Sequence, residues 1–266
     1  MTKRDKPVSL SKRLWNLADM LSPGGRVVDV GCDHGFLDIY LVQTGKMDGA
    51  LAMDVRKGPL AACTQHVRNA GLEERIETRL SDGLAEFHLG EAEKLVCAGM
   101  GGPLMQRILL DNPEKTESFR ELILQPQSEI REFRAFLREQ GYIITEERII
   151  LEDGKYYFPM KVLRGEEHEA EIHAAEELEL FDRYGKQLLQ NKDPLLLRYL
   201  TEQKRIMETI LAQLKATDQQ VKESSNANAG ENDEGQEYVT VSGREHRLLE
   251  ITMEWKLLQK AIKRME

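Results

Sequence analysis

The chain has 266 residues, of which 41% are hydrophobic and 31% charged, and a net charge of −9. This length allows one large domain or two smaller ones, and the composition is ordinary for a water-soluble protein. No apolar run approaches the roughly 20 residues that span a bilayer, and the N-terminus lacks the apolar core of a signal peptide, so we expect no membrane partner. The three cysteines lack metal-type spacing, which favours a reduced, cytoplasmic protein without a metal site.

Short β-like runs alternate with helix-like segments through the first part of the chain. The runs lie at 25–30, 49–55, 75–83, 94–102 and 119–126, and the helical segments at 35–44, 58–70, 103–111 and 127–140. This alternation predicts an α/β fold whose Rossmann-like parallel sheet is covered on both faces. Two further β-rich runs in 142–163 flank Asp153-Gly154, a strong tight-turn signal, and predict an antiparallel hairpin that closes the sheet.

Beyond residue 165 the composition becomes rich in Glu, Leu and Lys, which predicts a second, helical domain over 166–266. One helix is expected over 168–190 and another after Pro194, a residue favoured at helix starts. Apolar residues then recur at steps of three and four, the coiled-coil period, in two stripes of similar length that suit an antiparallel hairpin. They are Leu196, Leu200, Met207, Ile210 and Leu214, and later Leu248, Ile251, Trp255, Leu258, Ile262 and Met265. Between the stripes, the polar segment 216–237 carries a net charge of −5 and is predicted to be a mobile loop.

The first predicted strand runs into the sequence Val-Val-Asp-Val-Gly-Cys-Asp-His-Gly at 27–35, and a helix follows. Nucleotide-like ligands bind at this position of a parallel sheet. The spacing is D-x-G-x-D-x-G rather than the dinucleotide pattern, and Asp29, Asp33 and Asp38 would repel a pyrophosphate. These carboxylates can attract the sulfonium and ammonium groups of S-adenosylmethionine, so a nicotinamide-dependent oxidoreductase is disfavoured. The alternative is an ordinary turn with an accidental acidic cluster.

Later strand ends add further candidate cofactor contacts. Asp54 ends the second strand, where an acid typically accepts from ribose hydroxyls, and Asp82 could accept from an adenine amino group. The fourth strand ends in Gly99-Met100-Gly101, where bare backbone leaves room for two ligands side by side. Each has a simpler interpretation as a strand end, a turn residue or a flexible loop. The full predicted set of cofactor contacts is Arg13, Asp29, Gly31, Cys32, Asp33, Asp54, Val55, Asp82, Gly83, Gly99, Met100 and Gly101.

Several motifs, taken together and in order, resemble the bacterial tRNA adenine-N1 methyltransferases that modify adenosine 22. They are Ser9-Lys12-Arg13-Leu14, DVGCDHGFL, SDGL, AGMGG, LILQPQ and LEDGKYY, and they cover residues 9 to about 164. The resemblance implies the class I methyltransferase fold with a C-terminal helical, coiled-coil-like extension, S-adenosylmethionine as the cofactor and tRNA as the substrate. Two departures are Asp33, where the common motif has a glycine, and 216–237, which looks like an insertion.

The chemistry of adenine N1 suggests roles for two residues. N1 has an in-plane lone pair and can attack the methyl group without first losing a proton, so orientation is the main requirement. Methylation leaves positive charge on the base, which Asp33 is a candidate to stabilise, while His34 could orient the base or accept a proton. In the simpler alternative Asp33 only binds the cofactor and His34 caps or packs.

Candidate RNA contacts are less distinctive. Basic residues occur at the N-terminus, along 131–138 and near the C-terminus, but such residues also form solvated helix faces. They are Lys3, Arg4, Lys6, Lys12, Arg13, Arg131, Arg134, Arg138, Lys256, Lys260, Lys263 and Arg264. Tyr156 and Tyr157 could stack a base or belong to the core. A monomer is expected. The competing hypotheses are a small-molecule methyltransferase and a catalytically silent scaffold that displays a coiled coil.

Overall fold

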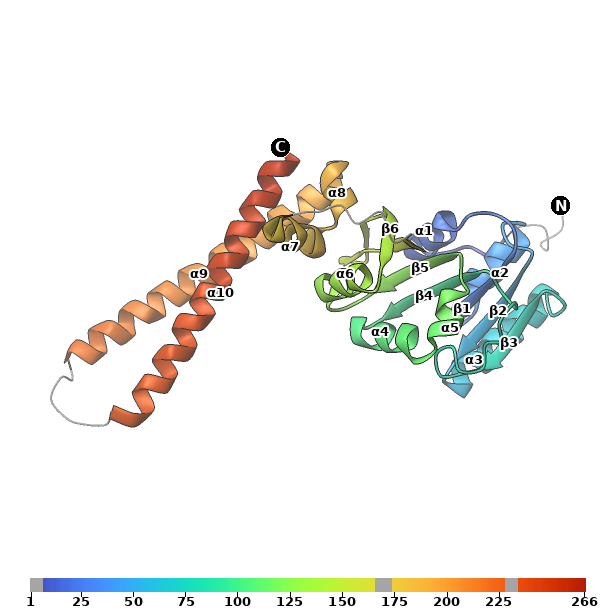
Figure 1. The fold of residues 1–266 in the computed structure, drawn as a ribbon, viewed down its shortest axis with the longest axis horizontal. Helices are drawn as coiled ribbons and strands as arrows, with labels where there is room; N and C mark the ends of the chain where they lie inside the picture. Colours follow the sequence, from blue (N-terminus) through green and yellow to red (C-terminus); the bar gives the residue numbers. More distant parts are fainter. Residues whose placement is uncertain (1–6, 166–173, 228–233) are drawn as a thin grey trace. The chain divides into compact units, whose positions relative to one another are not determined.

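A seven-stranded sheet forms the centre of the structure, a computed structural model that describes residues 7–165, 174–227 and 234–266. The strand order is β3-β2-β1-β4-β5-β9-β6 (Figure 1). The strands are β1 (Arg26–Val30), β2 (Gly49–Asp54), β3 (Ile76–Leu80), β4 (Lys94–Met100), β5 (Glu121–Pro126), β6 (Tyr142–Glu147) and β9 (Met160–Arg164). The first five are parallel, as predicted from the alternation of strands and helices.

Helices cover both faces of the sheet. One face packs against α1 (Lys12–Met20), α2 (Phe36–Gln43) and α3 (Lys57–Ala70) in a core that includes Leu17, Val27, Leu41 and Val67. Because successive strand residues point to opposite faces, the alternate residues meet α4 (Gly102–Asp111) and α6 (Ile130–Glu139). The short helix α5 (Pro113–Glu117) follows α4. The chain reverses its strand order between β1 and β4, and a crevice therefore opens at their carboxyl ends.

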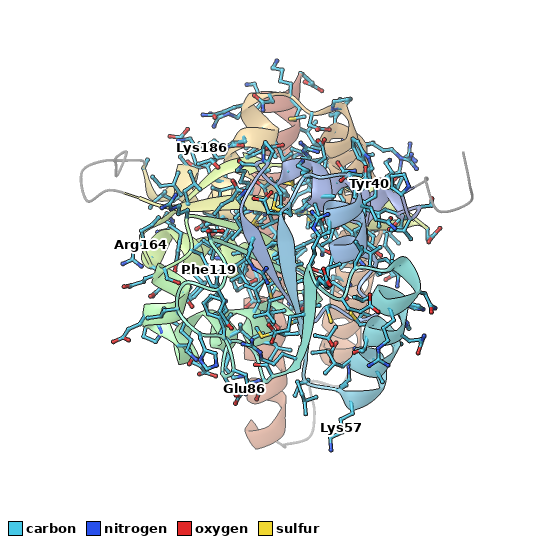
Figure 2. All side chains as sticks on the ribbon, turned by 90° about the vertical axis from the view of Figure 1, so that its right-hand side faces the viewer. Tyr40, Lys57, Glu86, Phe119, Arg164 and Lys186 are labelled. Atoms are coloured by element: carbon cyan, nitrogen blue, oxygen red, sulfur yellow. The ribbon has the colours of Figure 1, made fainter. Side chains whose placement is uncertain are left out.

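The surface of this part of the chain is strongly charged. Lys57, Glu86 and Arg164 are exposed and point away from the ribbon (Figure 2). Phe119 is only 3% exposed and belongs to the core beneath the sheet edge, where its ring centroid lies 5.0 Å from that of Phe87. Charged residues outside and large apolar residues inside are the arrangement that an independently folding α/β unit requires.

The antiparallel end of the sheet differs from the predicted hairpin. Asp153 and Gly154 do form a tight turn, but it joins β7 (Ile150–Glu152) to β8 (Lys155–Tyr157) in a separate two-stranded sheet. The strands that complete the main sheet are β6 and β9, and β9 lies between β5 and β6, antiparallel to both. The two runs are therefore split into four strands, and the turn signal belongs to the inner pair.

The chain divides into two units at Leu188 and Leu189, later than the predicted boundary at 165. The reason is α7 (Ala175–Tyr184), which packs on α6 and belongs to the first unit. A single helix over 168–190 is also wrong within the described residues. Gly185, with a φ of +87°, ends α7, and α8 (Lys186–Gln190) follows it. Residues 166–173 lie outside the described residues.

The second unit is a pair of long helices, α9 (Pro194–Ala227) and α10 (Glu234–Met265), which run side by side in opposite directions (Figure 1). The predicted loop at 216–237 is wrong in extent, since helix continues to Ala227 and resumes at Glu234. Ala, Gln, Lys and Glu have good helix propensity, so a polar segment without an apolar stripe can still be helical. Residues 228–233 lie outside the described residues, and the predicted mobility stays untested. In the part of the chain that the structure describes, no helix has the length and hydropathy of a membrane span.

Candidate active site

A cavity of about 800 Å³ opens at the carboxyl ends of the parallel strands. It brings together residues that lie far apart in the sequence, from α1 to the segment after β5. The predicted site residues that line it are Arg13, Asp29, Gly31, Cys32, Asp33, His34, Asp54, Val55, Asp82, Gly83, Gly99 and Met100. Gly101 does not line the cavity, because it caps the start of α4. The cavity is therefore where the sequence motifs meet.

The turn after β1 requires glycine at its first position. Gly31 has a φ of +81°, and its N–H donates to the carbonyl oxygen of Met53 on β2 at 2.8 Å. A Cβ at Gly31 would also collide with the side chain of Met100 at the end of β4. Asp33 follows with a φ of +50°, a conformation that few residues other than glycine adopt. The turn thus brings bare backbone to the edge of the cavity, where a ligand can approach closely.

Asp29 places an acid in the cavity wall with little solvent around it. The residue is 6% exposed, and this burial raises the pKa of its carboxyl to about 7, against the opposing effect of Arg13 and with a contribution from Asp54. Asp38, on α2, is fully buried, and neither of its carboxylate oxygens has a hydrogen-bond partner among the described residues. Burial and the neighbouring Asp29 raise the pKa of Asp38 as well. A cation from outside would relieve this concentration of acids.

Asp54 is held in place by the backbone around it. Its side chain is 2% exposed, and its oxygens accept hydrogen bonds from the N–H of Asp33 at 3.3 Å and of Arg56 at 2.8 Å. A carboxylate offers about four acceptor positions, so it retains capacity for a ligand hydroxyl. Asp33 and His34 are more open, with side chains 61% and 50% exposed and 3.8 Å between Asp33 Oδ1 and His34 Nε2.

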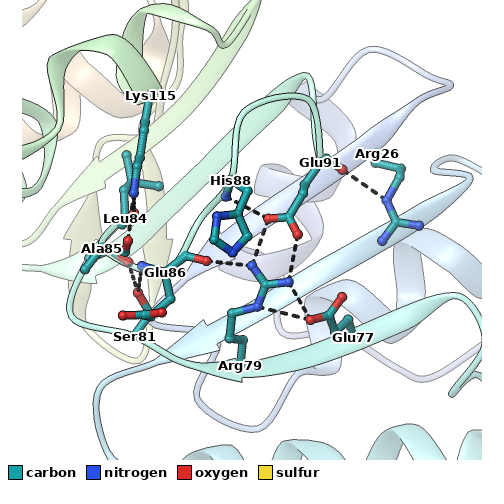
Figure 3. Close-up of polar contacts among 11 residues, drawn as sticks. Arg26, Glu77, Arg79, Ser81, Leu84, Ala85, Glu86, His88, Glu91 and Lys115 are labelled. Atoms are coloured by element: carbon teal, nitrogen blue, oxygen red, sulfur yellow. Dashed lines mark hydrogen bonds and ion pairs between the residues drawn. The ribbon is translucent and has the colours of Figure 1, made fainter.

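The loop after β3 carries Asp82 and Gly83. Two basic side chains, Arg79 and Lys115, hold it through hydrogen bonds and an ion pair. Arg79 pairs with Glu91 at 2.8 Å and donates to the Glu86 carbonyl oxygen at 2.6 Å, and this pairing lowers the pKa of Glu91 to about 2 (Figure 3). Lys115 donates to the carbonyl oxygens of Leu84 and Ala85 at 3.0 and 2.7 Å. Asp82 itself is exposed at the cavity, 3.1 Å from the guanidinium of Arg107. The network fixes the loop and leaves Asp82 accessible to a ligand.

The end of β4 leaves open space beside two polar side chains. A Cβ at Gly99 would lie 3.6 Å from Nε2 of Gln127 and 3.7 Å from a guanidinium nitrogen of Arg13. Arg13 donates to Oε1 of the buried Gln125 at 3.1 Å and lies 5.6 Å from the ring centroid of Tyr157. Next to this space, Gly102 packs so tightly that a Cβ would lie 2.7 Å from the carbonyl oxygen of Ser128. The arrangement makes a hydrogen-bonding wall, with the positive charge of Arg13 at its edge, suited to a second ligand.

Gln127, Arg56, Phe36 and Arg107 also line the cavity, and none was predicted as a site residue. Gln127 was signalled by its place directly after the fifth strand, in the LILQPQ motif. Phe36 belongs to the DVGCDHGFL motif, whereas Arg56 and Arg107 occupy a turn and a helix surface and carry no pattern of their own. They reach the site only through tertiary proximity.

The predicted RNA contacts on α6 are largely used within the protein. Arg134 is buried and pairs with Glu147 at 2.6 Å, so a phosphate contact there is wrong. Arg131 and Arg138 pair with acids of α7 at 2.7 Å each. In contrast, Lys256, Lys260 and Lys263 are exposed on α10. Lys3, Arg4 and Lys6 lie outside the described residues. No cluster of metal-ligating side chains occurs within 7–165, 174–227 or 234–266.

Comparisons with known proteins find a matching family model and similar solved structures. Residues 10–160 match a family model described as a methyltransferase domain. A Bacillus subtilis tRNA (adenine(22)-N(1))-methyltransferase is 37% identical over 150 residues, which span 56% of this chain and 63% of that relative, less than two thirds of its length. The solved structure of the B. subtilis M1A22 tRNA methyltransferase is 28% identical, with a TM-score of 0.76 and coverage of 96% of this chain and 99% of that one. A Streptococcus pneumoniae protein solved in complex with S-adenosyl-L-methionine is 26% identical, with a TM-score of 0.76 and coverage of 96% and 100%.

Proposed function

The chain belongs to the methyltransferase domain family, and from this we propose that it transfers a methyl group from S-adenosylmethionine to N1 of adenosine 22 in tRNA. The observation that carries the proposal is the acid-rich cavity at the ends of β1 and β2, beside the open wall at the end of β4. Such a cavity suits a cationic nucleoside and a neutral base side by side. We further propose that the protein acts in the cytoplasm as a monomer.

The residues of the cavity fit this cofactor. Asp29 is a buried acid that an ammonium group would stabilise, and Asp54 keeps acceptor capacity for ribose hydroxyls. Asp82 is exposed and can accept from the adenine amino group. The negative charge of these three acids would repel a cofactor that carries a pyrophosphate. The donor set therefore favours S-adenosylmethionine over a dinucleotide.

When bound, S-adenosylmethionine supplies an electrophilic methyl group on a sulfonium. The protein orients the reactants: Arg13, Gln127 and the open backbone at Gly99 form the wall against which the target adenine is held. N1 carries its own lone pair, and no side chain needs to remove a proton before the transfer. Asp33, exposed at the cavity, stabilises the positive charge that the base acquires, and His34 orients the base or the Asp33 carboxylate.

The test uses the full-length protein, an unmodified tRNA transcript and labelled S-adenosylmethionine. We expect one methyl group per tRNA, at N1 of adenosine 22. The matched control is the same transcript with guanosine at position 22, which should accept no label. Methylation of the control transcript, or at another nucleotide, would overturn the position, and labelling of small molecules alone would overturn the substrate class.

A further inference from the structure

Three aromatic rings gather where the turn after β1 meets α2 and α3. The rings of Phe36 and His66 stack with centroids 4.8 Å apart and an interplanar angle of 21°. His34 completes the group, with its centroid 6.0 Å from that of Phe36 and 5.8 Å from that of His66. Nδ1 of His66 lies 2.9 Å from the carbonyl oxygen of His34, a hydrogen bond that ties α3 to the turn. The three rings therefore form one group with fixed positions.

This group is rigid and open to solvent. A Cβ at Gly35 would collide with the side chain of Cys63, so the start of α2 lies directly against α3. Even so, Phe36 is 37% exposed and the His34 side chain is 50% exposed. Both residues line the cavity, whereas His66 does not. An aromatic surface thus extends from the edge of the cavity to the exterior of the protein.

The chemistry of this surface suits a planar base. Aromatic side chains bind unpaired nucleobases by stacking, with little dependence on which base is present. Arg56 also lines the cavity, 3.9 Å from Asp33, which is next to His34 in the chain, and its side chain is 66% exposed, so it offers a cation that a phosphate can meet. The adenine ring of the cofactor is expected near Asp82, after β3, and the target adenine near Gly99, after β4. The three rings follow β1 instead, so the outer faces of Phe36 and His66 are left open to a different base.

We propose that His34, Phe36 and His66 form a stacking site for an unpaired base of the RNA substrate, next to the base that is methylated. The inference rests on the proposed function for the identity of the RNA. It adds a second base contact, made by Phe36 of α2 and His66 of α3, and it borders the methyl-transfer position through His34 of the turn. The site anchors the strand so that the target base enters the cavity, and it acts on RNA affinity rather than on the transfer step.

The decisive variant is His66→Leu, since His66 contributes a ring without lining the cavity. We expect this change to raise the KM for unmodified tRNA about 5- to 20-fold, with kcat and the Kd for S-adenosylmethionine within about twofold of wild type. His66→Phe restores the ring without the imidazole hydrogen bond, and its KM should return to within about twofold of wild type. Gln65→Leu, on the exposed neighbouring position of α3, is the matched control and should leave KM unchanged.

Each alternative has its own outcome. An unchanged KM in His66→Leu overturns the stacking site, and a His66→Phe variant as impaired as His66→Leu shows that the bond to the His34 carbonyl, not the ring, matters. Equal weakening of cofactor binding would assign the rings to the cofactor. If wild type methylates no tRNA, the proposed function fails separately. Binding of a short single-stranded RNA to wild type and His66→Leu then still tests the rings, because equal affinities would overturn the site.

Discussion

Two clusters of buried charge lie in the first unit, and they solve the problem of burial in opposite ways. Beneath α7, the Arg134 side chain is 3% exposed and pairs with Glu147 at 2.6 Å, and it also donates to the Asp182 carbonyl oxygen at 2.9 Å. At the cavity, Asp29, Asp38 and Asp54 are buried together, and Arg13 is the cation that opposes the raised pKa of Asp29. One cluster has its countercharge within the protein. The other has more acid than base.

The difference shows how buried charges that stabilise the fold can be distinguished from buried charges that bind a ligand. A buried ion pair connects elements of the fold, here α6, β6 and α7, through the hydrogen bonds that Arg134 donates to Glu147 and to two carbonyl oxygens of α7. Buried acids without sufficient countercharge destabilise the ligand-free protein and gain from a cationic ligand. Removing one charge from the first cluster should therefore destabilise the protein, and removing one from the second should stabilise it. Three predictions test this contrast: two use substitutions and one uses pH.

The largest effect is expected from Arg134→Met. This change leaves the Glu147 carboxylate buried without its partner and should lower the free energy of unfolding by about 3 to 5 kcal/mol, measured by urea denaturation. The double variant Arg134→Met/Glu147→Leu removes both charges and should recover most of the loss. A double variant no more stable than the single one would show that the pair contributes more than relief of an isolated charge.

Asp29→Asn should separate stability from cofactor binding. It removes the charge that we propose faces the ammonium group, and the Kd for S-adenosylmethionine should rise about 10- to 100-fold in calorimetric titration. The same change should stabilise the ligand-free protein by about 1 to 3 kcal/mol at pH 8, because a raised carboxyl pKa costs stability as pH rises from the unfolded-state pKa of 3.8 to the folded-state pKa of about 7, and the full cost is present above it. Asp111→Asn, at an exposed position of α4, is the control. Loss of both affinity and stability would contradict the ligand-site interpretation.

The smallest effect is the pH dependence of cofactor binding in wild type. Asp29 has a pKa of about 7 in the ligand-free protein, raised by burial, so its carboxylate forms as pH rises through 7 and is neutralised as pH falls. The Kd for S-adenosylmethionine should therefore increase below pH 7, by at most about tenfold for each pH unit. Asp29→Asn should show a flat profile over pH 6 to 8. A flat wild-type profile would remove Asp29 as the group that meets the cation.

Sequence patterns were sufficient for the parallel sheet because each strand is a short apolar run followed by a helix with its own period. β1, β2 and β4 lie within two residues of their predicted ends. The helix α1 was missed although Ser11 caps it, accepting from the N–H of Leu14 at 3.3 Å. The four-strand arrangement over 142–164 was also missed, because local sequence signals a turn but not which strand inserts between two others.

The candidate site divides in the same way. Asp29, Asp54 and Gly99 were predicted because residues at the ends of neighbouring parallel strands must meet at one edge of the sheet. Arg107 reaches the cavity from α4, and its position depends on how that whole helix packs. Arg134 shows the converse, since a basic residue at helical spacing suggested a solvated face, while α7 and β6 enclose it. The positions of these side chains depend on residues that are distant in the sequence.

The hydrogen bonds and ion pairs between α6 and α7 affect where the chain can be cut and joined to another protein by gene fusion. The methyltransferase motifs end near residue 164, yet α7 supplies the two carbonyl oxygens that Arg134 binds and the carboxylates that meet Arg131 and Arg138. A crossover at residue 165 would remove these partners of the three guanidinium groups. A crossover between Leu188 and Leu189 keeps every one of these bonds within a single inherited module. The transferable catalytic module is therefore longer than the span of its recognisable motifs.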